Sequence, residues 1–295
     1  MMHGPTSSLW GRLVAGTIVP ALLATSAAFA QSRPKVAATI FPLYDIVREV
    51  GGAVVDVVLV LPPGASPHTF EPTPGGVRSL DGADLLFMIG HGLDDWAARM
   101  ARGAGVRRTV TVDCGIALRR EGGSADPHYW LSIINAQAIA GTVADEIERL
   151  APDRSTEIQR ALADYLARLG ATDGEIRRVL AGLPSRRIAT FHEAFGYFAD
   201  AYGLEVVATF EPFPGKEPGP RYVQEFQRTV RRTGLRVLFA EPQLALAPLR
   251  PIARDLGVTF GVLDPLGGVP GRQSYIDLML FDARQVAAAS RAPGP

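Results

Sequence analysis

The sequence predicts an α/β protein of two lobes, each a small parallel sheet flanked by helices, joined by a long helical spine. Three observations predict this class: strand-like and helix-like segments alternate early in the chain, a long helical pattern follows, and the alternation then resumes. Such alternation is typical of parallel sheets covered by helices on both faces. With 295 residues and a formal net charge of +0, the chain can form one or two domains with a sizeable core.

The first lobe is expected at residues 31–150, after the leader described below. Short runs rich in valine, isoleucine and leucine predict its buried strands at Lys35–Phe41, Val54–Leu61, Asp84–Ile89 and Thr109–Asp113. The helices expected between and after these strands are Asp45–Val50, Gly76–Leu80, Trp96–Arg102 and Asn135–Leu150.

The second lobe is expected at residues 185–295. Its predicted strands are Arg187–Phe191, Glu205–Phe210, Arg236–Ala240 and Val258–Leu263. Its predicted helices are Glu193–Tyr202, Arg221–Thr233 and Pro248–Leu256. Ligands of open parallel sheets bind beyond the carboxyl ends of the strands, so the residues that follow these strands matter most.

The spine is expected at residues 151–184. Pro152 and Asp153 suit a helix start, an apolar stripe follows at helical spacing, and Pro184 ends the pattern. Gly170 and Gly174 oppose one continuous helix, because each costs about 1 kcal/mol relative to alanine. Two shorter helices with a break near these glycines are the alternative.

The first 30 residues predict a cleavable signal peptide. Arg12 ends a short basic region, Leu13–Ala24 is mostly apolar, and Ala28-Phe29-Ala30 fits a cleavage site. A membrane anchor is the alternative, but the apolar run is shorter than the ~20 residues that span a bilayer. We therefore expect a periplasmic protein. The only cysteine, Cys114, is expected to be a small core residue, because it closes an apolar stretch.

Three histidines and one aspartate follow predicted strands. His68 and His128 follow the second and fourth strands of the first lobe, whereas His192 and Asp264 directly follow two strands of the second. Side chains so placed would converge between the lobes. Imidazole and carboxylate are ligands that zinc, manganese and iron prefer over thiolates. Taken singly, each histidine is more often a hydrogen-bonded loop or core residue, and the spacing does not fit a zinc finger.

The segments around these residues resemble a known family. They are Pro63–Pro74, which contains His68-Thr69-Phe70-Glu71-Pro72, then Asp126-Pro127-His128-Tyr129-Trp130-Leu131, His192–Phe198, Glu241-Pro242-Gln243 and Leu263–Gly267. Together they resemble the metal-binding solute receptors of ABC importers, the zinc and manganese group that includes the zinc-uptake and treponemal receptors. The resemblance covers the whole chain after the leader.

This resemblance implies both a function and a ligand set. It implies that His68, His128, His192 and Asp264 bind a divalent metal ion between the lobes, and that the receptor delivers the ion to an ABC permease. Such receptors are monomers, and it is left open whether a periplasmic metallochaperone loads this one. The balanced charge gives no indication of a nucleic-acid partner.

The residue at the third ligand position favours zinc. In the family that the chain resembles, a histidine there is typical of zinc receptors and a glutamate of manganese receptors. Three imidazoles and one carboxylate also suit tetrahedral Zn2+, whereas manganese prefers more oxygen ligands. We expect Zn2+, with an Mn2+ or iron receptor as the alternative.

The chain departs from the family pattern in two places. Residues 119–125 contain no histidine, whereas many zinc receptors carry a histidine-rich loop before the second ligand. Ser132-Ile133 stands after Leu131, where the family often has Asp-Pro. A metal-gathering loop is therefore not expected, and contacts around His128 are expected to differ.

Four further residues lie near the motifs. His91 is expected on the surface or as a partner of a ligand rather than as a ligand itself. Glu71, Glu193 and Glu241 are expected to orient imidazole N–H groups or to lie on the surface. Glu241 is the expected substitute if Asp264 does not bind the metal.

Two other classes of function compete with the receptor. A zinc hydrolase would keep three protein ligands, an open position and a nearby base such as Glu193 or Glu241. There is no His-Glu-x-x-His pattern, because His192-Glu193 continues as Ala194-Phe195-Gly196. The second rival is a surface adhesin with an incidental metal. We expect a receptor and not an enzyme.

Overall fold

The computed structural model describes residues 1–2, 4, 33–121, 123–211 and 215–291. Arg33–Pro295 is one compact unit, separate from Met1–Ser32. The signal peptide expected at residues 1–30 lies almost wholly outside the described residues. Within the described part of the chain, no helix combines the length and apolarity needed to cross a membrane.

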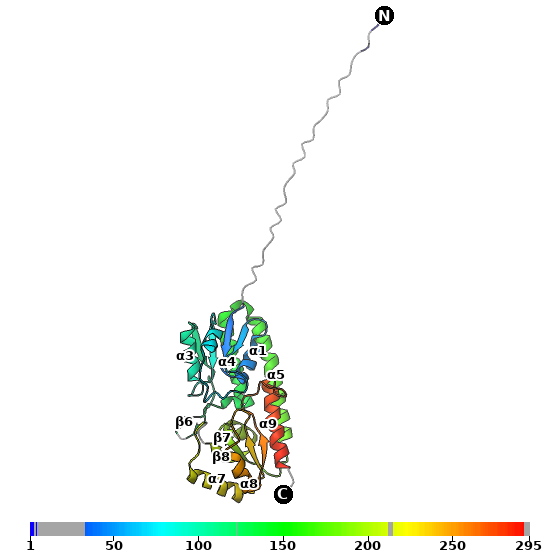
Figure 1. The fold of residues 1–295 in the computed structure, drawn as a ribbon. Helices are drawn as coiled ribbons and strands as arrows, with labels where there is room; N and C mark the ends of the chain where they lie inside the picture. Colours follow the sequence, from blue (N-terminus) through cyan, green and yellow to red (C-terminus); the bar gives the residue numbers. More distant parts are fainter. Residues whose placement is uncertain (3, 5–32, 122, 212–214, 292–295) are drawn as a thin grey trace. The chain divides into compact units, whose positions relative to one another are not determined.

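The first lobe, which begins with the blue and cyan segments of Figure 1, is a parallel four-stranded sheet flanked by helices. Its strand order is β2-β1-β3-β4. Its strands are β1 (Lys35–Ala38), β2 (Asp56–Leu59), β3 (Leu85–Met88) and β4 (Arg108–Thr111). Its helices are α1 (Phe41–Gly51), α2 (Pro74–Ser79), α3 (Asp95–Gly103) and α4 (Ile133–Leu150). Val36 of β1 lies between Val57 and Leu85, which fixes the register of the two central strands and of β2.

The second lobe repeats this arrangement. Its strands are β7 (Arg187–His192), β8 (Glu205–Glu211), β9 (Val237–Ala240) and β10 (Thr259–Val262), all parallel, in the order β10-β9-β7-β8. Its helices α6 (Gly196–Tyr202), α7 (Pro220–Thr233) and α8 (Leu249–Leu256) connect the strands. If the strands of each lobe are numbered along the chain, both sheets have the order second, first, third, fourth. The predicted α/β class is therefore confirmed.

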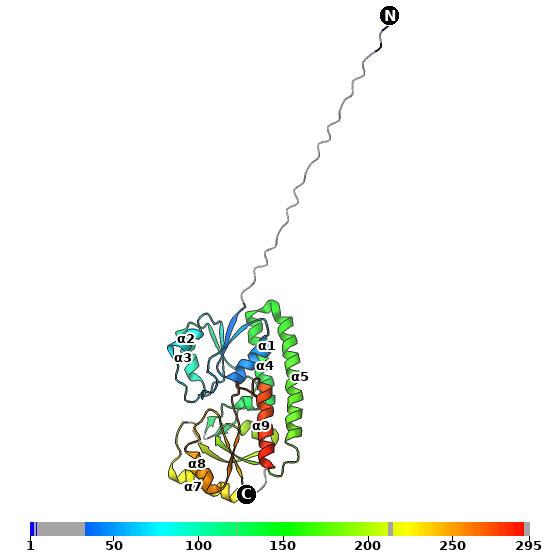
Figure 2. The same ribbon diagram turned by 45° about the vertical axis from the view of Figure 1, so that its right-hand side comes forward.

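Helix α5 (Ser155–Val179) is one continuous helix of 25 residues that packs against α1, α4 and α9 (Figure 2). Gly170 and Gly174 lie inside it, and a Cβ at either position would meet open space. The packing of the opposite face against α1, α4 and α9 offsets the helix-propensity cost of these glycines, so the alternative of two shorter helices is wrong. Helix α5 begins after a 3₁₀ turn, η2 (Pro152–Arg154).

Helix α9 (Tyr275–Ser290) was not expected from the sequence. The Ser274 side chain accepts a hydrogen bond from the Asp277 N–H at its start, and its buried residues recur at helical spacing. The helix packs against both α5 and α1, so the last helix of the chain reaches the first lobe. The two lobes also share one continuous cluster of buried apolar residues.

Three local expectations differ from the structure. Helix α6 begins at Gly196 rather than Glu193, because the chain leaves β7 only after His192 and then makes a tight turn. A hairpin of β5 (Arg120–Glu121) and β6 (Ser124–Ala125) precedes His128 and was not predicted. Cys114 is exposed and not a core residue, because the chain turns away from the sheet after the buried Val112.

Candidate metal centre

Three histidines meet between the lobes. His68 lies in the loop after β2, His128 immediately precedes the 3₁₀ turn η1 (Tyr129–Leu131), and His192 is the last residue of β7. The Nε2 atom of His128 lies 3.1 Å from Nε2 of His68 and 3.3 Å from Nε2 of His192. One nitrogen from each ring lies within 4.8 Å of the other two, and this is the only such cluster of His, Cys, Asp or Glu among the described residues.

Buried carboxylates orient two of the three rings. Asp126 Oδ1 accepts hydrogen bonds from the backbone N–H of His128 at 3.0 Å and from its Nδ1 at 2.9 Å. Glu241 Oε1 does the same for His192, at 3.0 Å from the backbone nitrogen and 2.6 Å from Nδ1. Because Nδ1 is the donor in both neutral rings, each Nε2 carries a lone pair aimed at the other. A cation between them satisfies both.

The loop that carries His68 is anchored on α3. The Trp96 indole N–H donates to the Pro67 carbonyl at 3.0 Å, and the Phe70 ring packs edge-on against Trp96 with 4.6 Å between centroids. These contacts lie on either side of His68 in the chain. They hold its ring 5.2 Å from that of His128 and 5.3 Å from that of His192, centroid to centroid.

The three imidazoles differ in their affinity for protons. Burial, together with the nearby His128 and His192, lowers the pKa of His68 to about 2. Burial also lowers the pKa of His128, against the opposing effect of Asp126. For His192 burial acts the same way, but the Glu241 carboxylate, together with Glu193 and Glu211, outweighs it and raises the pKa above the ordinary 6.5. Of the three rings, His192 is therefore the one at which protons compete most strongly with a bound cation.

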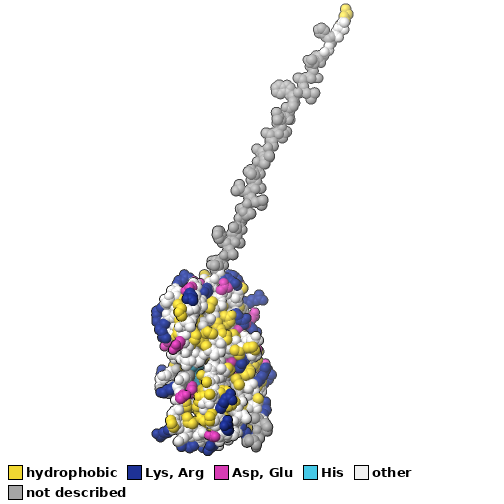
Figure 3. All heavy atoms as spheres, in the orientation of Figure 1, with side chains coloured by type: hydrophobic (Ala, Val, Ile, Leu, Met, Phe, Trp, Pro, Cys, Tyr) yellow, Lys and Arg dark blue, Asp and Glu magenta, His cyan; other side chains and the backbone are white. Residues whose placement is uncertain are grey.

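The free space at the centre is ion-sized. It measures about 10 Å³ and is lined by Ser66, Pro67, His68, His128, Trp130, His192, Glu241, Gln243, Leu244, Pro265 and Leu266. A cavity of this size holds a single ion or one water and excludes an organic solute. On the face drawn in Figure 3, the histidine colour is confined to a small spot between the lobes, consistent with a recessed site.

Asp264 lies outside the three-histidine cluster and does not line this space. It is fully buried after β10, and its Oδ1 accepts hydrogen bonds from Gln243 Nε2 at 2.8 Å and from the backbone N–H groups of Leu266 and Gly267 at 3.0 and 3.1 Å. Its Oδ2 lies 3.3 Å from Arg272 Nε and accepts no hydrogen bond. As placed, Asp264 shapes the loop that covers the site.

The other residues singled out from the sequence lie in different places. His91 is exposed and bonds through Nε2 to Asp113 at 2.9 Å, outside the histidine cluster. Glu71 is exposed and does not line the metal site. Glu193 accepts a hydrogen bond from Thr209 at 2.6 Å and contributes to the raised pKa of His192. Glu241 is the only one of the four whose side chain bonds to a histidine of the cluster.

Sequence reasoning did not assign roles to Asp126 and Gln243. Asp126 stands two residues before His128, a spacing at which an aspartate side chain readily bonds to the backbone N–H two residues on. That spacing was the available signal. Gln243 could not have been found this way, because its contact with Asp264 joins two loops 21 residues apart.

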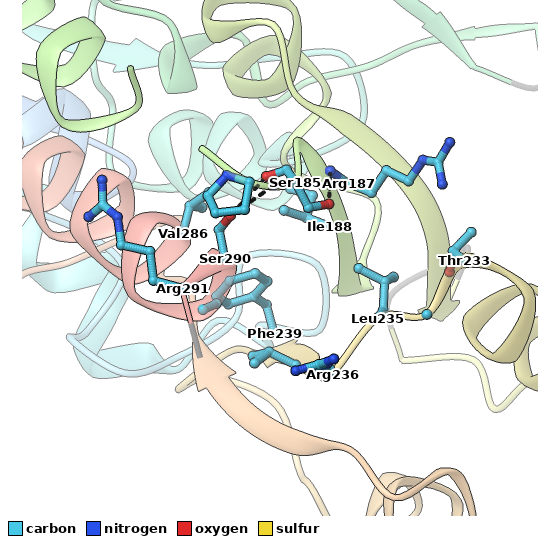
Figure 4. A pocket seen from close by; sticks show the side chains of 14 residues that line it. Ser185, Arg187, Ile188, Thr233, Leu235, Arg236, Phe239, Val286, Ser290 and Arg291 are labelled. Carbon is cyan, nitrogen blue, oxygen red and sulfur yellow. Dashed lines mark hydrogen bonds between the residues drawn. The ribbon is translucent and has the colours of Figure 1, made fainter. Parts of the chain in front are cut away.

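A larger pocket of about 410 Å³ lies elsewhere in the second lobe (Figure 4). It opens at the amino ends of β7 and β9, whereas His192 stands at the carboxyl end of β7. No His, Cys, Asp or Glu lines it among the described residues, and the Arg187 and Arg291 side chains point away from each other. This pocket therefore has no metal-binding chemistry.

Two lobes, each with a parallel sheet of the same strand order, and an ion-sized space between them lined by three imidazoles define a two-lobed protein with a candidate metal centre. Comparison with known proteins identifies the family. The profile described as "Zinc-uptake complex component A periplasmic" matches residues 36–289. The chain belongs to this family, and the resemblance expected from the motifs is confirmed.

Individual relatives agree with this assignment. The chain is 22% identical over 270 residues to the zinc-binding protein AdcA of Streptococcus pyogenes, covering 83% of the chain and 52% of that relative. The chain thus spans about half the length of this relative. A crystal structure of ZnuA superposes with a TM-score of 0.80 and 28% identity, covering 88% of this chain and 99% of that one. FpvC of Pseudomonas aeruginosa in complex with Mn2+ gives 0.79 and 27%, covering 88% and 98%.

Proposed function

We propose that this protein is the periplasmic receptor of an ABC import system, that it captures one Zn2+ between its lobes, and that it delivers the ion to the permease. The observation that carries the proposal is the pair of Nε2 atoms of His128 and His192, 3.3 Å apart, with both Nδ1 atoms bonded to carboxylates. In the neutral tautomers that these carboxylates favour, the two Nε2 lone pairs face each other, and a bound cation satisfies both. The family assignment and the zinc-binding relatives support the same function.

The spacing of the nitrogens suits zinc. Two imidazole nitrogens bound to tetrahedral zinc at ~2.0–2.1 Å stand about 3.3 Å apart. The separations of 3.1 and 3.3 Å around His128 lie close to that edge. Manganese is the second candidate cargo, because the relative FpvC is described in complex with Mn2+.

We further propose that Asp264 completes the ligand set of His68, His128 and His192. Its Oδ2 is the free acceptor of that carboxylate, since Oδ1 is held by Gln243 and two backbone N–H groups. The Arg272 guanidinium at 3.3 Å must give way for Oδ2 to reach the ion. Replacement of Asp264 by alanine should weaken zinc binding about tenfold or more if it is a ligand.

The remaining parts of the proposal rest on the sequence. The basic, apolar and cleavage-site pattern of residues 1–30 supports export with a cleaved leader, and the resemblance to solute receptors supports a monomer without catalytic activity. A periplasmic metallochaperone is a further partner to test. A hydrolase would require turnover of a substrate at the open fourth position, which a receptor does not show.

The test is the metal content of protein purified without chelator, measured by mass spectrometry after a challenge with equal zinc, manganese and iron. The expected result is one equivalent of zinc, lost in His128→Ala. His91→Ala is the matched control, since His91 is a histidine outside the cluster. One equivalent of manganese instead would change the cargo and keep the receptor. Absence of stoichiometric metal under all loadings would overturn the proposal.

A further inference from the structure

Arg119 of the first lobe is held against helix α6 of the second. Its backbone N–H donates to the Tyr197 hydroxyl at 2.7 Å, and its guanidinium lies 5.8 Å from the centroid of the Tyr197 ring. The guanidinium also forms an ion pair with Asp200, one turn further along α6. Arg119 thus contacts α6, the helix that follows the proposed ligand His192, through both its backbone and its guanidinium.

The same guanidinium faces the carboxylate that orients His128. Arg119 Nε lies 3.6 Å from Asp126 Oδ2, while Asp126 Oδ1 holds both N–H groups of His128. The Tyr197 hydroxyl donates to the Asp126 carbonyl at 3.1 Å, which ties α6 to the same segment. A continuous path of polar contacts therefore runs from Asp200 through Arg119 and Asp126 to His128.

The start of α6 leaves room for this arginine. Gly196 is the first residue of the helix, and a Cβ there would lie 2.6 Å from Arg119 Nε and 2.9 Å from Cζ. Real Cβ atoms do not approach so closely, so any larger residue would push the arginine away. The backbone of Gly196 has an ordinary conformation, so the space for Arg119, not the dihedral angles, requires glycine.

We propose that Arg119 is a positioning residue that couples the contact between the lobes to His128 and so slows release of the bound metal ion. The inference rests on the proposed receptor function. Asp126 is buried, with 2% of its side chain exposed, whereas 64% of the Asp200 side chain is exposed. The outer end of the path is open to solvent, salt and a docking partner, while its inner end holds a metal ligand.

The direction of the effect follows from this geometry. Arg119 by its charge repels a divalent ion, but the Asp126 carboxylate stands between them and screens that charge. Loss of Arg119 removes the anchor of Asp126 Oδ2, so the carboxylate gains freedom and holds His128 less firmly. Partners of metal-binding histidines typically change affinity 10–100-fold when mutated, and a residue one contact further out should change it less.

The experiment measures the rate of zinc release from the full-length protein into excess chelator. We expect release about threefold to tenfold faster in Arg119→Gln and in Gly196→Ala than in the wild type. Gly196→Ala is the sharper variant, because it displaces the arginine and leaves every charge in place. The matched controls are Arg120→Gln, an exposed neighbour, and Gly174→Ala, where a Cβ meets open space.

Salt provides a readout that a merely structural role would not move. The ion pair with Asp200 is exposed, so raising ionic strength should speed release from the wild type and have little effect in Arg119→Gln. Asp200→Asn breaks the outer contact alone and substitutes for Gly196→Ala if that variant does not fold.

The outcomes separate the two proposals. A wild type without stoichiometric zinc overturns the receptor function and this inference together. A wild type that binds zinc, with release in Arg119→Gln and Gly196→Ala within twofold of the controls, overturns the inference alone. Slower release in Arg119→Gln also overturns it, because that result assigns the guanidinium a purely repulsive role.

Discussion

The two lobes share one strand order, but the residue at the carboxyl end of the first strand has a different role in each lobe. In each lobe a polar residue at the carboxyl end of the first strand bonds to an acid that follows the third. In the first lobe these are Thr39 and Asp94, joined at 2.6 Å, and in the second they are His192 and Glu241, joined at 2.6 Å. Both acids are buried.

The acids differ in what they serve. Asp94 accepts two further hydrogen bonds, from the backbone N–H groups of Ile89 and Gly90 at 2.8 Å each, and so closes its own loop. Glu241 bonds to the backbone N–H and Nδ1 of His192, which leaves that ring's Nε2 available to a metal ion. The topology therefore creates a polar position at the switch between first and third strands, and the residue placed there decides between structure and binding.

The largest expected effect contrasts the two first-strand residues. His192→Ala should weaken zinc binding about a hundredfold or more, because it removes one of the proposed ligands. Thr39→Ala should leave the zinc affinity within about threefold and lower the free energy of unfolding by about 1 kcal/mol, the value of a buried hydrogen bond. Chelator-competition titrations and urea unfolding measure the two quantities. A strong loss of zinc in Thr39→Ala would show that the lobes are not divided in this way.

The two acids give the next largest contrast. Glu241→Gln should weaken zinc binding about 10-fold to 100-fold with little loss of stability, because an amide orients His192 poorly. Asp94→Asn should lower the free energy of unfolding of the metal-free protein by about 2 kcal/mol, since one amide NH2 then faces a donor. The same two assays apply. Equal losses of zinc in both variants would contradict the distinction.

The pH dependence tests whether one proton or several compete with the metal. Burial and the neighbouring rings lower the pKa values of His68 and His128, so both rings resist protonation more strongly than a free imidazole. Burial disfavours charge on His192 too, but Glu241 raises its pKa. Zinc affinity should therefore fall as pH drops through the raised pKa of His192, by about tenfold per pH unit.

This dependence is measured as the dissociation constant from about pH 5 to about pH 8, across the titration range of histidine. The expected slope is about one proton per ion. A slope near three would mean that the histidines of both lobes titrate alike.

The smallest effect concerns the helix that both lobes share. Gly174→Ala in α5 should raise the free energy of unfolding by about 0.5–1 kcal/mol, because the methyl meets open space and alanine favours a helix. Gly52→Ala is the contrasting variant: Gly52 follows α1 with a φ of 51°, so a side chain there should destabilise the protein. Urea unfolding resolves both. A loss of stability in Gly174→Ala would mean that a side chain at this position meets a neighbour, which contradicts the open space in the structure.

Strand and helix positions were predictable because they depend on local patterns. Continuous apolar runs such as Asp84–Ile89 matched β3, and Pro152 with Asp153 marked the approach to α5. Helix α9 had the same kind of signal, including a capping serine, yet was not predicted. The turn that exposes Cys114 was not predictable, because a short apolar run says where a strand lies but not where the chain leaves the sheet.

The residue types of His68, His128 and His192 could be read from the chain, and so could their places after a strand or at its end. Residues so placed gather at the carboxyl edge of a parallel sheet. Their separations of 3.1 and 3.3 Å could not, because they depend on how two lobes pack. The contacts of Asp264 could not be read from the sequence either. Its position after a strand suits a ligand, but its Oδ1 accepts hydrogen bonds from Gln243, Leu266 and Gly267. The bond from Glu241 that aims the His192 Nε2 inward, and the approach of Arg119 to Gly196, arise only when segments far apart in the sequence meet. The direction of such a hydrogen bond depends on three-dimensional contact.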